Sequence, residues 1–272
     1  MNLPGWSAHT YPHAPLEILE IISEFMILMF LFDDECEKAA ISKRSEWLAP
    51  THARFVDILK GAELTDSDTL FARALADIRP RLLQYATSEW MLRFTGCVED
   101  YFKGVLWEAT NYSQEITLDV ATYIQLGHLA SGADFCFVFL YLTEQLALPF
   151  EVMEHPIVKR LYLAACHIAG WANDIFSAEK EIREGWDHNL VVILQNEHQL
   201  SLQEAIERAA SLHDVEVRTF IELSAQLPSF GAEIDAELQR YLSALRFLMR
   251  GSLDWQQESL RYRPTETTPL AA

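Results

Sequence analysis

Three oxygen-bearing side chains recur one helical turn apart in the segment W-A-N-D-I-F-S-A-E-K-E, residues 171–181. They are Asn173, Ser177 and Glu181, at positions i, i+4 and i+8, so a helix would place them on one face. That face presents an amide, a hydroxyl and a carboxylate oxygen in a row about 12 Å long, which is costly to bury unless a polar or charged group meets it. Mg²⁺ takes few protein oxygens and shares its remaining positions between water and phosphate. The row is therefore suited to bind Mg²⁺ together with a diphosphate.

A second group of acidic residues lies in the segment F-L-F-D-D-E-C-E-K, residues 30–38. Asp33 and Glu37 are one helical turn apart on one face, and Asp34 lies beside them. Hard divalent cations prefer oxygen ligands, so carboxylates at the end of an apolar helix face are suited to bind them. Acidic groups at a helix C-terminus also oppose the helix dipole, which makes a purely structural role less favourable. Taken alone, each pattern also fits a solvated polar surface.

Composition and charge restrict the class of protein. The chain has 272 residues, of which 50% are hydrophobic and 22% charged, so it can bury a large core. Its 21 basic residues against 40 acidic ones give a net charge of −19, which would repel nucleic acid and excludes it as a partner. An acidic protein can still bind an anion where metal ions mediate the contact.

Cysteine usage and hydropathy predict a cytoplasmic protein without membrane insertion. The N-terminus lacks the basic and apolar regions of a signal peptide. The most apolar stretches, residues 25–32 and 135–142, are too short to span a bilayer. The four cysteines are scattered without paired spacing, which is typical of reduced thiols: Cys36, Cys97, Cys136 and Cys166.

Helical periodicity dominates the spacing of apolar residues along the chain. There are only 10 Gly and 10 Pro, and no run alternates cleanly between apolar and polar side chains. The segment S-L-Q-E at 201–204 has the pattern of a helix capping box. The sequence therefore predicts an all-α, single-domain helical bundle. The predicted helices cover approximately residues 15–36, 65–87, 89–111, 117–129, 132–146, 154–183, 201–227, 231–249 and 252–261.

Together the two polar segments resemble the metal motifs of the class I terpene synthases, most closely those of the bacterial type. F-L-F-D-D-E-C-E is similar to their aspartate-rich motif, and N-D-I-F-S-A-E-K-E to their N-D-x-x-S-x-x-x-E motif. Asp33 and Asn173 are 140 positions apart, the usual interval in that family. Further similarities are W-E-A at 107–109, H-N-L-V at 188–191 and the pair Arg261-Tyr262, so the resemblance extends from about Tyr11 to Tyr262.

The resemblance implies a helical bundle whose central helices enclose an apolar pocket, with a catalytic domain over residues 15–262. Residues 1–14 would form an N-terminal arm and residues 263–272 a disordered tail. It also implies three Mg²⁺ ions, replaceable by Mn²⁺. Two would be bound at Asp33 and Glu37, and the third at the row Asn173, Ser177 and Glu181.

The resemblance assigns further roles to individual residues. Lys180 and Arg261 would donate hydrogen bonds to the diphosphate, Tyr262 would help to close the site, and Asp34 would complete the first motif. Ser131 and its neighbour Gly132 would form a helix break whose backbone faces the reacting carbon. Four side chains are expected to line the pocket, although ordinary core positions would explain them equally well: Met26, Met29, Phe30 and Trp255.

The activity implied is Mg²⁺-dependent ionisation of a prenyl diphosphate, followed by cyclisation of the carbocation and release of diphosphate. The substrate would be farnesyl diphosphate or a C20 diphosphate such as geranylgeranyl or copalyl diphosphate, and the product a hydrocarbon or an alcohol. A homodimer is common in the family. One alternative is a chain-elongating prenyltransferase, which normally has two aspartate-rich motifs where this chain has one. Another is a helical protein that binds metal or diphosphate without turnover.

Two features depart from the family pattern. Bacterial members usually carry a diphosphate-sensing arginine 46 positions before the asparagine of the second motif, where this chain has Gly127. Since that arginine also pairs with the second aspartate of the first motif, Asp34 is expected to lack a partner. A reshaped site for a larger or bicyclic diphosphate would explain the loss. In addition, only 32 residues precede Asp33, so we expect shortened N-terminal helices and poorer exclusion of water.

Overall fold

Four long helices form the frame of the molecule: α2 (Leu16–Ile41), α5 (Ser88–Ser113), α9 (Pro156–Glu184) and α12 (Ala232–Glu258). The computed structural model describes residues 2–262, and within that range it contains helices and no strands. The other elements are α1 (Leu3–Thr10), α3 (Leu48–Lys60), α4 (Leu70–Leu82), α6 (Val120–Ala130), α7 (Ala133–Thr143), α8 (Phe150–Met153), α10 (Leu190–His198), α11 (Leu202–Ser224) and the 3₁₀ turn η1 (Leu260–Tyr262). The predicted all-α fold class is confirmed. The predicted tail, 263–272, lies outside the described residues.

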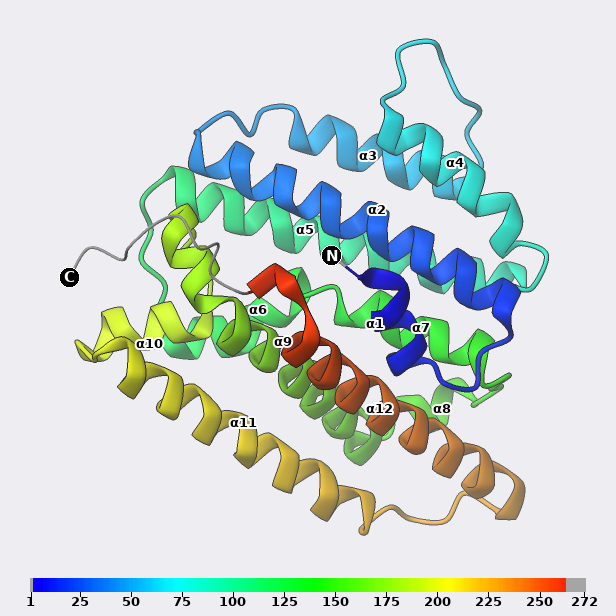
Figure 1. Cartoon of the computed structure of the whole chain (residues 1–272). Helices are drawn as coiled ribbons and strands as arrows, with labels where there is room; N and C mark the ends of the chain where they lie inside the picture. The colour runs from blue at the N-terminus through cyan, green and yellow to red at the C-terminus, as the bar shows by residue number, and fades with distance from the viewer. Residues whose placement is uncertain (1, 263–272) are drawn as a thin grey trace.

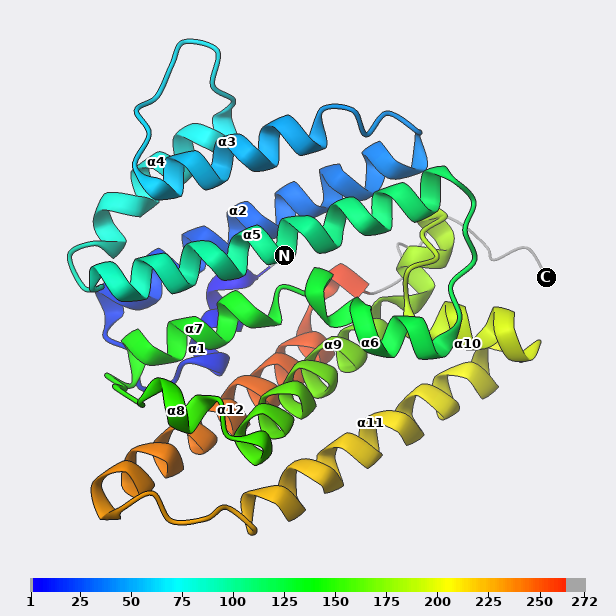
Figure 2. The same ribbon diagram turned by 180° about the vertical axis from the view of Figure 1, so that it is seen from behind.

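The helices pack around a centre, and the broken helix α6–α7 forms the wall that faces the viewer in Figure 2 (compare Figure 1). Helices α3 and α4 cover the outer side of α2 and α5, while α11 covers α9 on the opposite side of the molecule. Helix α9 also packs against α12, α6 and α7, so it contacts the centre directly. This arrangement brings α2, which carries the first acidic segment, and α9, which carries the second, to the same interior.

Local sequence explains where these helices begin and end. Helix α2 buries Ile18, Ile21, Ile22 and Phe25, which recur with the helical period. Helix α9 ends at Gly185, whose left-handed φ of +84° is readily adopted by glycine. Several other helices begin with a residue whose side chain accepts a hydrogen bond from a backbone N–H of the first turn. The capping box predicted at 201–204 is present at the start of α11.

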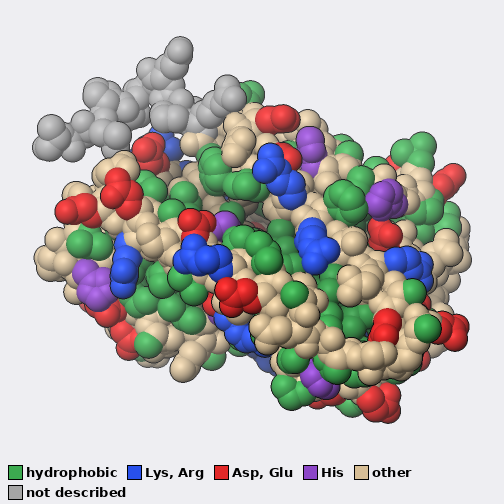
Figure 3. Space-filling view, turned by 90° about the horizontal axis from the view of Figure 1, so that it is seen from below, with side chains coloured by type: hydrophobic (Ala, Val, Ile, Leu, Met, Phe, Trp, Pro, Cys, Tyr) green, Lys and Arg blue, Asp and Glu red, His purple; other side chains and the backbone are tan. Residues whose placement is uncertain are grey.

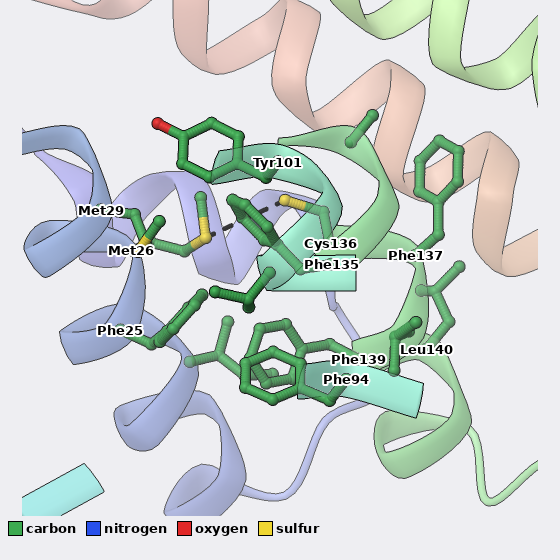
Figure 4. Packing of buried hydrophobic residues seen from close by; sticks show 14 of the residues in the cluster. Phe25, Met26, Met29, Phe94, Tyr101, Phe135, Cys136, Phe137, Phe139 and Leu140 are labelled. Atoms are coloured by element: carbon green, nitrogen blue, oxygen red, sulfur yellow. Dashed lines mark hydrogen bonds between the residues drawn. The ribbon is translucent and has the colours of Figure 1, made fainter. Parts of the chain in front are cut away.

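Aromatic side chains join three helices at the base of the interior (Figure 4). The ring of Phe25 on α2 makes edge-to-face contacts with Phe94 on α5 and with Phe135 and Phe139 on α7, at centroid distances of 5.1, 5.4 and 5.6 Å. Such pairs contribute about 0.5–1.5 kcal/mol each beyond the area that they bury. They fix the start of α7 relative to α2 and α5.

The predicted helix break at Ser131–Gly132 is confirmed, since α6 ends at Ala130 and α7 begins at Ala133. Gly132 has a φ of +69°, and a Cβ atom there would lie 2.5 Å from the ring of Phe135. Only glycine fits this turn without strain. The break leaves the last carbonyl groups of α6 without partners in a continuing helix.

The segment 1–14, expected as an arm, contains the helix α1, which packs against α2 and α12. The indole of Trp6 donates a hydrogen bond to Ser252 Oγ at 3.1 Å, and that of Trp255 donates to the carbonyl of Asn2 at 2.6 Å. The contact is close because Gly251 has no side chain: a Cβ there would lie 2.3 Å from the carbonyl oxygen of His9. A short N-terminal segment therefore still covers the interior.

The predicted helix boundaries are wrong at several places. The prediction separates two helices at residues 250–251, but α12 continues through this point to Glu258, because the small residues Gly251 and Ser252 accommodate α1. The helix predicted at 65–87 covers only Leu70–Leu82. Sequence reasoning missed α1, α3, α8 and α10, although α3 buries His52, Phe55, Val56 and Leu59 at helical spacing.

Among the described helices, no single one is both long and apolar enough to cross a membrane. Helices α6 and α7 taken together pass that test, but the pair is bent by 43° at the break between them.

Substitution of Gly251 by Ala should destabilise the protein, because the new methyl group would meet the α1 backbone, which cannot move as a flexible side chain would. Overpacking of this kind costs about 1–3 kcal/mol, or a fall in Tm of roughly 2–6 °C for a domain of this size. Thermal unfolding followed by circular dichroism would measure it.

The matched control is Gly96→Ala in α5, where a Cβ would meet nothing within 4 Å. Its Tm should stay the same or rise, since alanine favours the helix over glycine by about 1 kcal/mol. Equal shifts for the two variants would contradict the close contact between α1 and α12.

Candidate active site

A cavity of about 190 Å³ lies at the centre of the bundle. The four side chains expected to line the pocket, and Ser131 of the expected helix break, lie on its wall together with Gly127: Met26, Met29, Phe30, Ser131 and Trp255. Trp6 of α1 also lines it, as do the aromatic rings of Tyr101, Phe135 and Trp171. The wall therefore combines apolar and aromatic side chains with polar and acidic ones.

Acidic side chains converge on this cavity. On the outer face seen in Figure 3, carboxylates are scattered among basic and hydrophobic side chains. Five carboxylates line the cavity itself: Asp33, Glu37, Glu108, Asp174 and Glu181. Like charges in a partly dry environment disfavour one another's ionisation, so this gathering needs compensating positive charge.

The first motif presents Asp33 and Glu37 from α2. The hydroxyl of Tyr101 donates to Asp33 Oδ1 at 2.7 Å, which leaves the other carboxylate oxygen for a further ligand. Burial raises the pKa of Asp33, although Tyr101 and Arg261 partly oppose the shift. Burial and the neighbouring Asp33 raise the pKa of Glu37 to about 9.

Asp34 is bound by Arg261, so the expectation that it lacks a cationic partner is wrong. Arg261 donates from Nη2 to Oδ1 at 2.6 Å and from Nη1 to Oδ2 at 3.1 Å. Burial alone would raise the pKa of Asp34, but the hydrogen bonds and charge of Arg261, together with Lys180, lower it below its ordinary value. Lys180 Nζ lies 3.7 Å from Asp34 and 3.8 Å from Glu37. The partner comes from η1, which the fold brings back to α2.

The second motif also contacts the 3₁₀ turn η1, through Tyr262. Asn173 Nδ2 donates to the hydroxyl of Tyr262 at 2.9 Å, so its amide oxygen is free to accept or to bind a cation. The adjacent residues Arg261 and Tyr262 therefore contact one motif each. The cavity wall includes Asn173 and Glu181, while Ser177 lies just behind it, buried between α9 and the start of α10.

Asn189, which was not singled out as a site residue, contacts two members of the polar row. Its Nδ2 lies 2.8 Å from Glu181 Oε2 and 3.3 Å from Ser177 Oγ. Burial raises the pKa of Glu181, while hydrogen bonds from Ser177 and Asn189 oppose the shift. The only sequence signal was the family-like H-N-L-V segment.

Glu108 of α5 is the second functional candidate that sequence reasoning left out. It lines the cavity, and burial together with Asp33 and Glu37 raises its pKa well above the ordinary value. Its signal was present in the sequence, because Tyr101, Val105 and Glu108 share one helix face and a carboxylate on an otherwise apolar face is unusual.

The oxygen-rich donor set fits a hard divalent cation such as Mg²⁺ or Mn²⁺, because carboxylate, amide and hydroxyl oxygens are its preferred protein ligands. Within residues 2–262, no three Asp, Glu, His or Cys side chains come close enough to enclose an ion by themselves. An ion here would complete its coordination with water or with oxygens of a bound anion, as Mg²⁺ commonly does.

Position 127, where the family usually has an arginine, is a glycine that packs against an aromatic ring. A Cβ on Gly127 would lie 2.9 Å from Cε2 of Tyr123, whose ring lies over the glycine. The Tyr123 hydroxyl donates to Asp174 Oδ2 at 2.9 Å, so the ring is held in place. The space next to Gly127 is therefore already occupied.

A family model described as "Terpene synthase family 2, C-terminal metal binding" matches residues 24–219. The chain belongs to the terpene synthase family. It is 38% identical over 264 residues to "Germacrene A synthase" of Nostoc punctiforme, covering 97% of this chain and 82% of that protein. It is 39% identical over 260 residues to "(+)-T-muurolol synthase ((2E,6E)-farnesyl diphosphate cyclizing)" of Roseiflexus castenholzii, covering 95% and 79%.

A solved structure shares the fold of this terpene synthase. The crystal structure of germacradien-4-ol synthase from Streptomyces citricolor has a TM-score of 0.80 at 23% identity, covering 94% of this chain and 83% of that one. The predicted family, a class I terpene synthase of the bacterial type, is confirmed, and the chain is an enzyme that depends on divalent metal. The prenyltransferase and non-catalytic alternatives are not favoured.

The raised pKa of Glu37 predicts how the metal-free synthase responds to pH. The folded protein holds this proton more tightly than the unfolded chain, so the stabilisation is complete below the ordinary pKa of 4.5 and is lost as the pH rises to about 9. In the presence of EDTA, the Tm of the wild-type protein should fall between pH 6 and 9. In Glu37→Gln, which cannot ionise, the fall should be smaller; parallel curves would contradict the assignment.

Introducing the family's arginine by Gly127→Arg should not raise turnover, because Tyr123 must move and give up its hydrogen bond to Asp174. We expect kcat/KM at or below the wild-type value in a steady-state diphosphate-release assay. Gly96→Ala is the control, since Gly96 is not part of the cavity wall and a Cβ there would meet nothing within 4 Å. A tenfold gain in Gly127→Arg would show instead that the site lacks only the arginine.

Proposed function

We propose that this terpene synthase ionises farnesyl diphosphate and cyclises the resulting carbocation to a sesquiterpene. The observation that carries the proposal is the link made by Arg261 and Tyr262 between Asp34 and Asn173, beside the cavity that Asn173 lines. It holds the two acidic motifs together as a site suited to a diphosphate, next to the aromatic and apolar side chains suited to a hydrocarbon chain. The chain is 38% identical to the germacrene A synthase and 39% identical to the T-muurolol synthase. The name of the latter specifies farnesyl diphosphate, which supports a C15 substrate over a C20 one.

The oxygens on the two helices would hold three Mg²⁺ ions, two at Asp33 and Glu37 and one at Asn173, Ser177 and Glu181. Bound there with the diphosphate, the ions would act as Lewis acids that stabilise the leaving group as the carbon–oxygen bond breaks. The carboxylates that hold them must be ionised, so metal binding releases the protons that burial favours in the metal-free form.

Arg261 and Lys180 would contribute hydrogen bonds to the diphosphate. Arg261 uses Nη1 and Nη2 on Asp34, but its guanidinium has five N–H groups and so retains donors for a phosphate oxygen. Lys180, next to Glu181 and close to Asp34 and Glu37, supplies a second positive charge. Tyr262, bound to Asn173, would keep η1 closed over the site.

The apolar part of the cavity would protect the carbocation. The rings of Trp255, Trp171 and Tyr101 line the cavity, and an aromatic ring attracts a cation placed over its face by about 0.5–2 kcal/mol. Residues at the α6–α7 break also line the cavity. The C-terminal end of α6 carries partial negative charge, so its carbonyl groups would stabilise positive charge on the substrate. Trp6 and α1 would exclude water from this side.

Purified protein incubated with Mg²⁺ should convert farnesyl diphosphate to a cyclic C15 product and release diphosphate, with kcat/KM at least about tenfold higher than for geranylgeranyl or copalyl diphosphate. Gas chromatography with mass spectrometry would identify the product. Excess EDTA should abolish turnover, and added Mg²⁺ should restore it.

The matched control is Asp119→Ser, a substitution at the exposed N-cap of α6 that should leave turnover unchanged. Preferential turnover of a C20 diphosphate would overturn the proposed substrate. Longer diphosphates formed with isopentenyl diphosphate, or no turnover of any of these substrates, would overturn the proposed reaction.

A further inference from the structure

A buried polar junction lies behind the second motif, where α10 begins beside α9. At its centre is Asn189, which is 0% exposed. Its Oδ1 accepts from the backbone N–H of Val191 at 2.8 Å and so caps the start of α10. Since the oxygen is used there, the Nδ2 group must face α9, and the orientation of the carboxamide is fixed by the cap.

The Nδ2 group of Asn189 is surrounded by three acceptors on α9. These are the carbonyl of Asp174 at 2.9 Å, Glu181 Oε2 at 2.8 Å and Ser177 Oγ at 3.3 Å. The two side-chain acceptors belong to the polar row that the sequence presents at i+4 and i+8. One neutral donor therefore contacts both of them without adding charge.

The side chain of Asp174 holds the same junction from a second direction. Its Oδ2 accepts from the backbone N–H of Leu190 at 3.1 Å and from the Tyr123 hydroxyl at 2.9 Å. The middle of α9 is thus fixed to α10 and to α6 by buried hydrogen bonds. Rotation of α9 would break several of them at once, and a change of rotamer at Glu181 would break its hydrogen bond with Asn189.

We propose that Asn189 is a positioning residue for the metal site formed by Asn173, Ser177 and Glu181. This inference rests on the proposed function. Asn189 holds Ser177 and Glu181 in place before any ion arrives, so the ion does not have to order them. A hydrogen bond to a ligating carboxylate leaves its second oxygen for the cation, and loss of such outer partners commonly weakens metal binding about 10–100-fold.

The competing role is that of a helix cap alone, and Asn189→Ser separates the two. Serine caps helices about as well as asparagine, but its hydroxyl is too short to cap α10 and also reach Glu181. The matched control is Asp119→Ser at the N-cap of α6, where Asp119 Oδ1 accepts from the backbone N–H of Thr122 at 2.7 Å.

The test is titration calorimetry of Mg²⁺ with inorganic diphosphate into wild-type protein, Asn189→Ser and Asp119→Ser, together with the Tm of each. We expect Asn189→Ser to weaken binding about 10–100-fold, with Asp119→Ser within about threefold of wild type. Asn189→Asp supports the same test if Asn189→Ser folds poorly, because it keeps the cap acceptor but replaces the donor with a carboxylate beside Glu181.

Binding by both Asn189 variants within about threefold of wild type would overturn the positioning role and leave the proposed function standing. Weaker binding in Asp119→Ser equal to that in Asn189→Ser would assign the effect to capping alone. Failure of the wild-type protein to bind Mg²⁺ and diphosphate would overturn both this inference and the proposed function.

Discussion

The structure depends on one electrostatic constraint: five carboxylates face a largely buried cavity from three different helices. Burial and mutual repulsion raise the pKa values of Asp33, Glu37, Glu108, Asp174 and Glu181. Lys180 and Arg261 supply only part of the positive charge that these groups need. An acidic protein can therefore accept a polyanionic diphosphate here, because both are stabilised by the same divalent cations.

The rest of the site serves to hold these charges in place. Arg261 and Tyr262 join the two motifs, and Asn189 with Asp174 fixes the metal-binding face of α9 to α10. The cavity wall contains these hydrogen-bonded polar groups together with aromatic and apolar side chains. This combination suits a reaction that begins with loss of a charged leaving group and continues on a hydrocarbon cation.

Much of the fold could be predicted from the sequence, because helical periodicity is a local property. The helices carrying Asp33 and Asn173, and the break at Gly132, follow from apolar spacing and family motifs. The failures have identifiable causes. Gly251 was read as a helix end, but it is the point where α1 approaches α12, and such an approach cannot be seen in a single chain segment. The helix α10 is short, and its start depends on caps that also bind α9.

The sequence by itself determined which side chains share a helix face: Asn173 with Ser177 and Glu181, and Asp33 with Glu37. That follows from the helical repeat of about 3.6 residues. Only the tertiary structure decided their partners. Arg261, 227 positions from Asp34, replaces the partner expected from an arginine at position 127, and Tyr123 occupies the space beside Gly127. Such pairs depend on how helices are placed in space, and the local spacing of residues carries no information about that placement.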